Sequence, residues 1–359
     1  MSKRSIVPFG PQHPVLPEPI HLDLVLEDEK VVEAIPSIGF VHRGLEKLVE
    51  KRDFQDYVYV AERICGICSF MHGMGYFQAI ENIMDVEVPA RAKYLRVIWA
   101  EMSRIHSHLL WLGLAADAFG FESLFMQSWR LREKILDMFE YSTGGRVIFS
   151  VNKIGGVLRD MDSDMLKKFL AMFHDMEKEI KALTDVFLSD YSVNYRLRGV
   201  GILTKEQAHN LGAVGPMMRA SGIAQDTRKL GYAAYGELEF EPIISNIGDS
   251  YARCDVRIHE IFQSLDLIRQ AIGKIPSGDI SAIVKGAPNG EFFSRLEQPR
   301  GEVIYYCKGN GTKFLDRMRV RTPTFANIPA MLETLKGCDL ADVPTLILTI
   351  DPCISCTER

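Results

Sequence analysis

Hydrophobic positions follow a helical period through the middle of the chain and a strand period near both ends. From Pro89 onward, apolar residues recur every three to four positions, as on the buried face of a helix, and proline is favoured in a first turn. Residues 162–164 offer caps for a later stripe, and Thr204 with Gln207 fits a capping box. The helical stripes cover residues 95–112, 131–139, 166–187 and 254–272.

The two ends of the chain read as antiparallel hairpins. Residues 21–35 alternate between apolar and polar around an acidic turn, and a loop follows. The alternation returns after Arg300, where Asn310-Gly311 separates two alternating segments and signals a hairpin turn. No strand–helix–strand alternation appears. We therefore predict an α+β, mostly α, single domain over 1–359, with an N-terminal hairpin at about 20–36, a helical core at about 70–275, a C-terminal hairpin at about 300–322 and a tail at 351–359.

Composition and charge are those of a globular enzyme. Of the 359 residues, 47% are hydrophobic and 25% charged, which excludes a disordered or collagen-like chain. The net charge is −5 and the basic residues are dispersed, so we expect no nucleic acid as a partner. The best candidate for a spanning helix, residues 105–116, is shorter than the roughly 18 residues that such a helix needs. Prolines interrupt the N-terminal region where the apolar segment of a signal peptide would lie, so we expect a cytoplasmic chain.

The cysteines give the first hint of chemistry. Seven is an odd number in a chain without a secretion signal, which favours thiolate chemistry over a disulfide framework. Four of them form the pairs Cys65-Gly66-Ile67-Cys68 and Cys353-Ile354-Ser355-Cys356, nearly three hundred residues apart. Zinc ribbons pair such units at roughly 15–20 residues. Spacing alone favours a four-thiolate metal centre, and structural zinc and a redox disulfide stay open as alternatives.

The residues around the pairs make the pattern more specific. Arg63 and His72 flank the first pair in the string Arg-Ile-Cys-Gly-Ile-Cys-Ser-Phe-Met-His, and Asp351-Pro352 precedes the second pair. Together these strings resemble the two nickel-binding motifs of NiFe hydrogenase large subunits. The stretch 42–47 and the tripeptide Pro299-Arg300-Gly301 are further marks of that family.

Two other strings narrow the resemblance to one branch. The opening Gly10-Pro11-Gln12-His13-Pro14 and the run 107–113 are similar to the branch that contains the membrane-bound energy-converting hydrogenases. Within that branch, the short length of the chain most resembles the Ech-type and CO-induced hydrogenases. That branch is related to the 49-kDa subunit of complex I, the NADH-quinone oxidoreductase. The complex I relatives have lost the cysteine pairs, whereas both pairs are present here.

The resemblance implies a Ni-Fe centre with CO and CN− ligands on the iron. Cys65 and Cys353 would be terminal nickel ligands, and Cys68 and Cys356 would also bridge to iron. Cys353 would act as the base, and Glu18 would relay the proton away from it. A solvated loop carboxylate is the alternative for Glu18.

Other residues are expected around the thiolates. Arg300, next to Pro299, would lie over the open metal position, unless it is a surface arginine at a hairpin edge. Asp351 and Arg63 would orient the thiolates and neutralise their charge, with a capping role as the alternative. His72 would donate to a sulfur or be a satisfied core histidine. Glu46 matches a possible Mg2+ ligand, but the chain ends in Arg359 where the family pattern has histidine, so a pair with Arg43 or Arg359 is an equal alternative.

The resemblance also implies partners, because no further cysteines here are arranged for an iron–sulfur cluster. They are a hydrogenase small subunit with a proximal 4Fe-4S cluster, a ferredoxin-like iron–sulfur subunit, integral membrane ion-translocating subunits, and external ferredoxin as electron donor. The implied reaction is reversible, 2H+ + 2e− to H2, at the cytoplasmic side of the cell membrane. A quinone-site subunit of a complex I-like oxidoreductase and a zinc-stabilised structural subunit are the alternatives.

Overall fold

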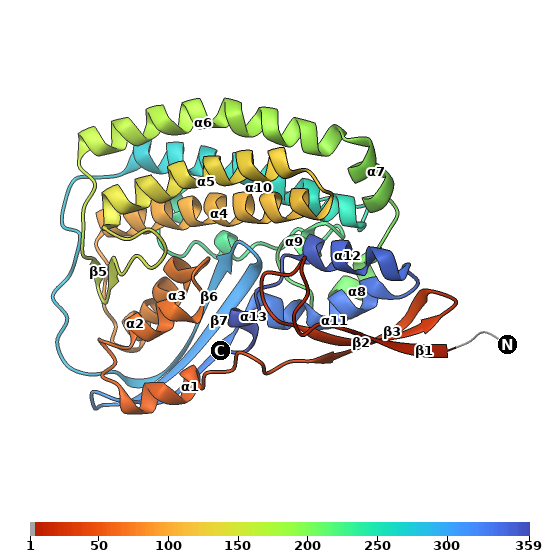
Figure 1. The fold of residues 1–359 in the computed structure, drawn as a ribbon. Helices are drawn as coiled ribbons and strands as arrows, with labels where there is room; N and C mark the ends of the chain where they lie inside the picture. Colours follow the sequence, from red (N-terminus) through yellow and green to blue (C-terminus); the bar gives the residue numbers. More distant parts are fainter. Residues whose placement is uncertain (1–3) are drawn as a thin grey trace.

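The computed structural model describes residues 4–359, and four long helices form its largest layer. These helices lie side by side above the remaining elements (Figure 1). Asp162 accepts a hydrogen bond from the Met165 amide at the start of one of them, and Thr204 and Gln207 form the expected capping box on a shorter helix. The long helices are α4 (Ala90–Ala118), α5 (Glu122–Thr143), α6 (Ser163–Ser189) and α10 (Ser250–Lys274), and the capping box opens α8 (Lys205–Asn210). The four predicted helical stripes are confirmed.

An antiparallel sheet in the order β1-β2-β3 lies at the N-terminal end. The strands β2 (His21–Glu27) and β3 (Lys30–Ser37) are the predicted hairpin. The third strand, β1 (Arg4–Phe9), was not predicted. Of its residues only Phe9 is buried, so β1 lacks the alternation of apolar and polar positions that reveals a half-buried strand.

A second antiparallel sheet, in the order β6-β7-β8, lies near the C-terminal end. The prediction missed β6 (Asn289–Gln298), whose first half is largely exposed. It also expected a two-residue turn at Asn310-Gly311, but β7 (Gly301–Asn310) and β8 (Leu315–Arg321) are joined by residues 311–314. The Asn310 side chain accepts hydrogen bonds within this loop instead.

Shorter elements connect these layers. None of the helices within residues 4–359 combines the length and apolar character needed to cross a bilayer. The shorter elements are α1 (Leu45–Leu48), η1 (Val49–Lys51), α2 (Val58–Ala61), η2 (Glu62–Ile64), α3 (Ser69–Ile83), β4 (Asn152–Lys153), β5 (Gly156–Val157), α7 (Tyr191–Leu197), α9 (Pro216–Arg219), η3 (Thr227–Leu230), η4 (Tyr235–Glu237), α11 (Pro323–Leu335), η5 (Leu340–Asp342), α12 (Val343–Ile350) and α13 (Ile354–Thr357).

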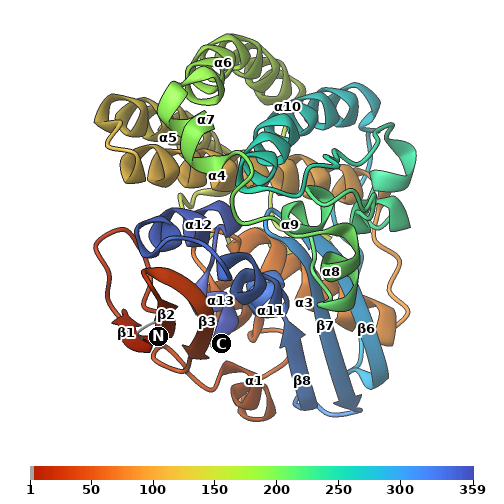
Figure 2. The ribbon, with the colours of Figure 1, turned by 90° about the vertical axis from the view of Figure 1, so that its right-hand side faces the viewer.

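The C-terminal segment is held in the middle of the molecule. The C-terminus lies between the N-terminal sheet and β8 (Figure 2). Trp111 on α4 donates to the Leu348 carbonyl at 2.9 Å, and Arg257 on α10 donates to the carbonyls of Thr349 and Ile350. These bonds satisfy the free carbonyls at the end of α12. They fix the helix end from which the second cysteine pair begins.

A buried ion pair joins the first half of the core. Glu81 on α3 accepts from both terminal guanidinium nitrogens of Arg96 on α4, at 2.6 and 2.9 Å. Arg96 also donates to the carbonyls of Lys153 and Gly156 in the β4–β5 hairpin. The side chains of Glu81 and Arg96 are only 5% and 4% exposed. The pair therefore fixes α3, which carries the residues after the first cysteine pair, against α4.

We expect Glu81→Gln to lower the free energy of unfolding by about 3–5 kcal/mol, because it leaves the buried Arg96 charge without its counter-ion. Glu140→Gln is the matched control, since Glu140 pairs with Arg146 at 56% and 37% exposure and should cost less than about 1 kcal/mol. Urea unfolding of the full chain measures both changes. Equal effects of the two substitutions would contradict this role of the pair.

Candidate metal centre

Four cysteines from opposite ends of the chain lie together in the core. The sulfur of Cys65 is 3.4 Å from that of Cys353, and the sulfur of Cys68 is 3.4 Å from that of Cys356. The sulfurs of Cys65, Cys68 and Cys356 all lie within 4.8 Å of one another, and all four residues are at most 3% exposed. All seven cysteines are free. The convergence that the sequence hypothesis requires is therefore observed in the fold.

Each pair stands at the start of a helix. Cys65 follows the η2 turn in extended backbone, and Cys68 is the N-cap of α3. After α12 the chain turns sharply at Asp351, whose φ of 58° is left-handed, and Cys353 becomes the N-cap of α13. In both pairs the first sulfur accepts a backbone N–H from its own turn, from Ile67 at 3.3 Å and from Cys356 at 3.4 Å. These turns aim the four sulfurs at one point.

A single arginine ties the two cysteine segments together. Arg43 donates to the Ile64 carbonyl at 3.0 Å and to the Ser355 carbonyl at 2.8 Å. Each acceptor belongs to the residue directly before a cysteine, Cys65 or Cys356. Residues 42–47 were recognised only as a family mark, and no local pattern indicates this bridge. The arginine fixes the distance between two segments that no regular element joins.

Arg300 and Asp351 form a buried ion pair beside the sulfurs. The guanidinium donates to the Asp351 carboxylate and carbonyl, each at 2.7 Å, and the two side chains are 3% and 4% exposed. The alternative of a surface arginine is wrong. Pro299 is buried in the turn before β7, and Gly301 has φ 127° with its α-carbon so close to Gly215 that a side-chain carbon would lie 2.8 Å from the Gly215 nitrogen. This turn holds Arg300 inward.

The electrostatics favour positive charge at this point. Burial by itself would lower the pKa of Arg300. The charge of Asp351 and the neighbouring sulfurs of Cys353 and Cys65 raise the pKa by more than burial lowers it, so the pKa lies well above its ordinary value. Hydrogen bonds, first of all from the Cys353 thiol, hold the pKa of Cys65 well below its ordinary value. Burial raises the pKa of Cys68 well above it. The fixed charge of Arg300 therefore acts on the sulfurs of Cys353, Cys65 and Cys68, which a bound metal cation would help to ionise.

His72 contacts the site directly. Its Nε2 lies 3.3 Å from the Cys356 sulfur, and its Nδ1 lies 2.5 Å from the hydroxyl of Tyr305. Burial lowers the pKa of His72 to about 4, so the ring is neutral at pH 7. The expected contact with a sulfur is present. Tyr305 was not among the sequence candidates, because only the register of β7 brings it to this ring.

Glu18 reaches the second pair from the loop between β1 and β2. Its half-buried carboxylate accepts from the backbone amides of Ile354 and Ser355 and from the Ser355 hydroxyl. These are the residues directly after Cys353. Glu18 is therefore not a freely solvated loop acid, the alternative that the sequence left open.

Arg63 lies away from its expected position, and Glu46 takes one of the two roles that the sequence left open. Arg63 is exposed and donates to the Tyr59 carbonyl at 2.7 Å, because the η2 turn directs it away from the sulfurs. Glu46 accepts from Arg359 and Arg319, each at 3.0 Å, and from the Val320 amide. Both carboxylate oxygens of Glu46 are thus bonded to donors that occupy the place of a cation. These residues do not fit a Mg2+ site, and the pairing of Glu46 with Arg359 is the alternative observed.

A carboxylate that the sequence did not single out lies three residues before the first cysteine. Glu62 is fully buried, and one of its oxygens accepts from the amide and hydroxyl of Ser150, at 3.1 and 2.8 Å. Its other oxygen has no partner among the described residues. Burial raises the pKa of Glu62 to about 7, and the bonds from Ser150 offset this only in part.

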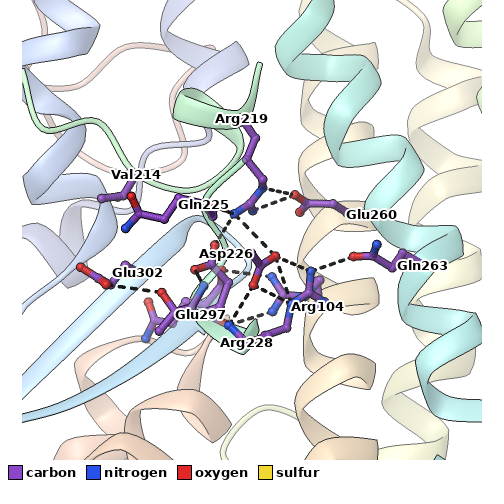
Figure 3. A network of polar contacts seen from close by, with 12 residues as sticks. Arg104, Val214, Arg219, Gln225, Asp226, Arg228, Glu260, Gln263, Glu297 and Glu302 are labelled. Carbon is purple, nitrogen blue, oxygen red and sulfur yellow. Dashed lines mark hydrogen bonds and ion pairs between the residues drawn. The ribbon is translucent and has the colours of Figure 1, made fainter. Parts of the chain in front are cut away.

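A buried ionic network includes Arg104, Arg219, Glu260 and Glu297 (Figure 3). It lies at the end of β6, the strand that leads to Arg300. Arg104 on α4 donates to the carbonyls of Glu297 and Gln298, at 2.8 and 3.1 Å, where β6 ends before Pro299. Arg219 pairs with the carboxylates of Glu260 and Glu297, each at 2.7 Å. The network links α4, α9, α10 and β6. It was not predictable, because its charged residues come from distant helices and loops.

The chain is similar to two groups of known proteins. Residues 118–287 and 283–359 match the respiratory-chain NADH dehydrogenase 49 Kd subunit, and residues 43–115 match nickel-dependent hydrogenase. Membrane-bound hydrogenase subunit alpha of Pyrococcus furiosus is 38% identical, over 98% of this chain and 87% of that protein. The carbon monoxide-induced hydrogenase of Rhodospirillum rubrum is also 38% identical, over 98% and 99%.

A solved structure has the same fold. A chain in the membrane-bound sulfane sulfur reductase (MBS), an archaeal respiratory membrane complex, is 31% identical with a TM-score of 0.94, over 99% of this chain and 98% of that one. The first cysteine pair falls in the nickel-dependent hydrogenase match, and the second falls in the 49-kDa match.

The raised pKa of Glu62 should make the stability of the folded chain depend on pH. The Glu62 pKa of about 7 in the folded chain is above the ordinary 4.5, so the folded chain holds the proton more tightly and loses stability as pH rises through 7. Glu62→Gln has no such proton. Between pH 5 and pH 8 we expect the free energy of unfolding of wild type to fall by about 3 kcal/mol relative to that of the variant. Urea unfolding across this range measures the difference, and a constant difference would contradict the shifted pKa.

Proposed function

Since this chain belongs to the oxidoreductase family of the respiratory-chain NADH dehydrogenase 49-kDa subunit and of membrane-bound hydrogenase subunits, we propose that it is the catalytic subunit of an energy-converting NiFe hydrogenase. The reaction is the reversible reduction of protons to H2. The observation that carries this proposal is the meeting of four buried cysteine sulfurs beside the buried guanidinium of Arg300.

The residues present fit a centre of nickel and iron. Thiolates are soft ligands that suit such metals, and four of them can hold one metal while two also bridge to a second. Cys65 and Cys353 are the terminal ligands of this proposal, and Cys68 and Cys356 the bridging ones. One oxygen of Asp351 is buried without a partner among the described residues, which supports a further polar group at the site. When bound, the Ni-Fe centre with its CO and CN− ligands would supply the heterolytic activation of H2.

The chain's own residues handle charge and protons. Arg300 supplies the fixed positive charge beside the sulfurs, and Asp351 holds its guanidinium in place. The Cys353 sulfur takes up or releases the proton of the reaction. Glu18 is bonded to the amide of Ile354, one residue further, and is half-buried, so it can pass a proton between that sulfur and water.

Partners follow from the relatives. Their names are those of membrane-bound hydrogenases and of a respiratory membrane complex, which supports a place for this chain in such a complex. We propose that its neighbours are a small subunit with a proximal 4Fe-4S cluster, a ferredoxin-like subunit and ion-translocating membrane subunits. External ferredoxin is the proposed electron donor, at the cytoplasmic face of the membrane.

There are two alternatives to this proposal. The match to the 49-kDa subunit supports a quinone-site subunit of a complex I-like oxidoreductase, and the four thiols could instead belong to a zinc-stabilised structural subunit. A quinone-site subunit has no use for four converging thiols. A zinc-stabilised structural subunit would use the thiols but neither the Arg300–Asp351 pair nor Glu18. The metal content of the purified complex separates the three.

Loss of one terminal thiol is expected to empty the centre. Metal analysis of the purified complex should find nickel and iron, with infrared bands of CO and CN− bound to iron. In Cys353→Ser the nickel and the bands should fall to background, because a serine hydroxyl is a poor ligand for nickel. Cys338→Ser is the control, since Cys338 lies in a separate apolar cluster. Zinc in place of nickel, or full nickel in Cys353→Ser, would contradict the proposal.

Removal of the proton relay is expected to slow turnover without loss of metal. We expect Glu18→Gln to keep its nickel and to lose roughly 10²–10⁴-fold in the rate of H2/D+ exchange, as for a lost general acid–base group. Glu33→Gln, on an exposed position of β3, should exchange like wild type. Undiminished exchange in Glu18→Gln would show that the proton leaves by another route.

A further inference from the structure

Tyr305 is buried against the helix that follows the first cysteine pair. It lies on β7, the central strand of its sheet, and is fully buried. A side-chain carbon at Gly75 on α3 would come within 2.8 Å of the Tyr305 ring, so the glycine makes room for it. One turn earlier on α3 is His72, whose ring meets the Tyr305 ring edge-on at 5.9 Å. The hydroxyl therefore reaches Nδ1 of His72 at 2.5 Å.

The hydrogen bond between the Tyr305 hydroxyl and the His72 ring can have only one direction. A tyrosine hydroxyl carries one proton, and a neutral imidazole has one N–H donor and one bare nitrogen acceptor. Among the described residues, His72 is the sole hydrogen-bond partner recorded for the Tyr305 hydroxyl. If Nδ1 carried the proton, the buried tyrosine O–H would have no acceptor, which proteins avoid. The hydroxyl must therefore donate to Nδ1, and the ring proton must sit on Nε2.

That Nε2 faces the sulfur of Cys356 at 3.3 Å. We propose that Tyr305 is a positioning residue that fixes the tautomer of His72, so that His72 donates its Nε2 hydrogen to Cys356. The part that concerns a bridging sulfur rests on the proposed function. A hydrogen bond donated to a thiolate draws electron density away from it and so tunes a metal bound there. No proton is transferred, since the tyrosine sets only which nitrogen is the donor.

The neighbouring residue offers a matched control. Tyr306 is next on β7 but faces the opposite side of the sheet, where its hydroxyl donates to the Glu291 carboxylate at 2.6 Å. Tyr306→Phe and Tyr305→Phe remove the same atom from the same strand. Only loss of the hydroxyl at position 305 should change which ring nitrogen of His72 carries the proton.

The test is the 15N spectrum of the full chain with labelled histidine, prepared without metal. The signals of His72 are those that disappear in His72→Gln. We expect wild type and Tyr306→Phe to show an unprotonated Nδ1 and a protonated Nε2 at His72. In Tyr305→Phe the Nδ1 signal should shift toward the protonated position, because nothing then holds one tautomer. A protonated Nδ1 in wild type, or an unchanged His72 pattern in folded Tyr305→Phe, would overturn the proposal.

The wild-type spectrum alone decides the tautomer even if Tyr305→Phe fails to fold. It also separates this proposal from the function proposed above, because the spectrum needs no nickel, whereas absence of nickel from the native complex would overturn only the function. In metal-loaded complexes, we expect the infrared bands of the iron ligands to shift in Tyr305→Phe and not in Tyr306→Phe. Equal bands in the two variants would overturn the link from His72 to the metal through Cys356.

Discussion

Four sulfurs held within a few ångströms inside a protein repel one another once they ionise. The residues around them in this chain offset that repulsion. The fold offers positive charge through Arg300, a hydrogen bond to sulfur through His72, and rigid turns that keep the sulfurs from drifting apart. Arg300 is itself costly to bury, and Asp351 compensates it. The result is a cluster of four buried sulfurs with a paired guanidinium beside it.

The layers of the fold serve this cluster by fixing its parts from several sides. Arg43 joins the two cysteine segments, Arg257 and Trp111 hold the helix end before the second pair, and Arg104 holds the strand end before Arg300. In each case an arginine or tryptophan N–H from one layer is bonded to a backbone carbonyl of another. Backbone carbonyls cannot change rotamer, so such bonds locate a segment more firmly than contacts between two side chains do.

Much of this could be predicted from the sequence, and the gaps have physical causes. The four long helices are predictable because each has a stripe of apolar residues. In β1 and at the start of β6 too few residues are buried to give alternating apolar and polar positions. The cysteine pairs stand out by their spacing, and His72 and Glu18 were found through strings that resemble a family. Tyr305, Glu62 and the bridging role of Arg43 were not, because their partners lie far away in sequence and nothing local marks the contact. Arg63 was misplaced because a motif fixes which residue is present but not where its side chain points.

The central claim is that the four sulfurs hold nickel next to iron. X-ray absorption at the nickel edge of the purified native complex tests it most directly, since the fine structure reports the atoms around the metal. We expect nickel surrounded by sulfur, with iron as its next heavy neighbour. Nickel bound mainly through nitrogen and oxygen, nickel without an iron neighbour, or no nickel at all would contradict it.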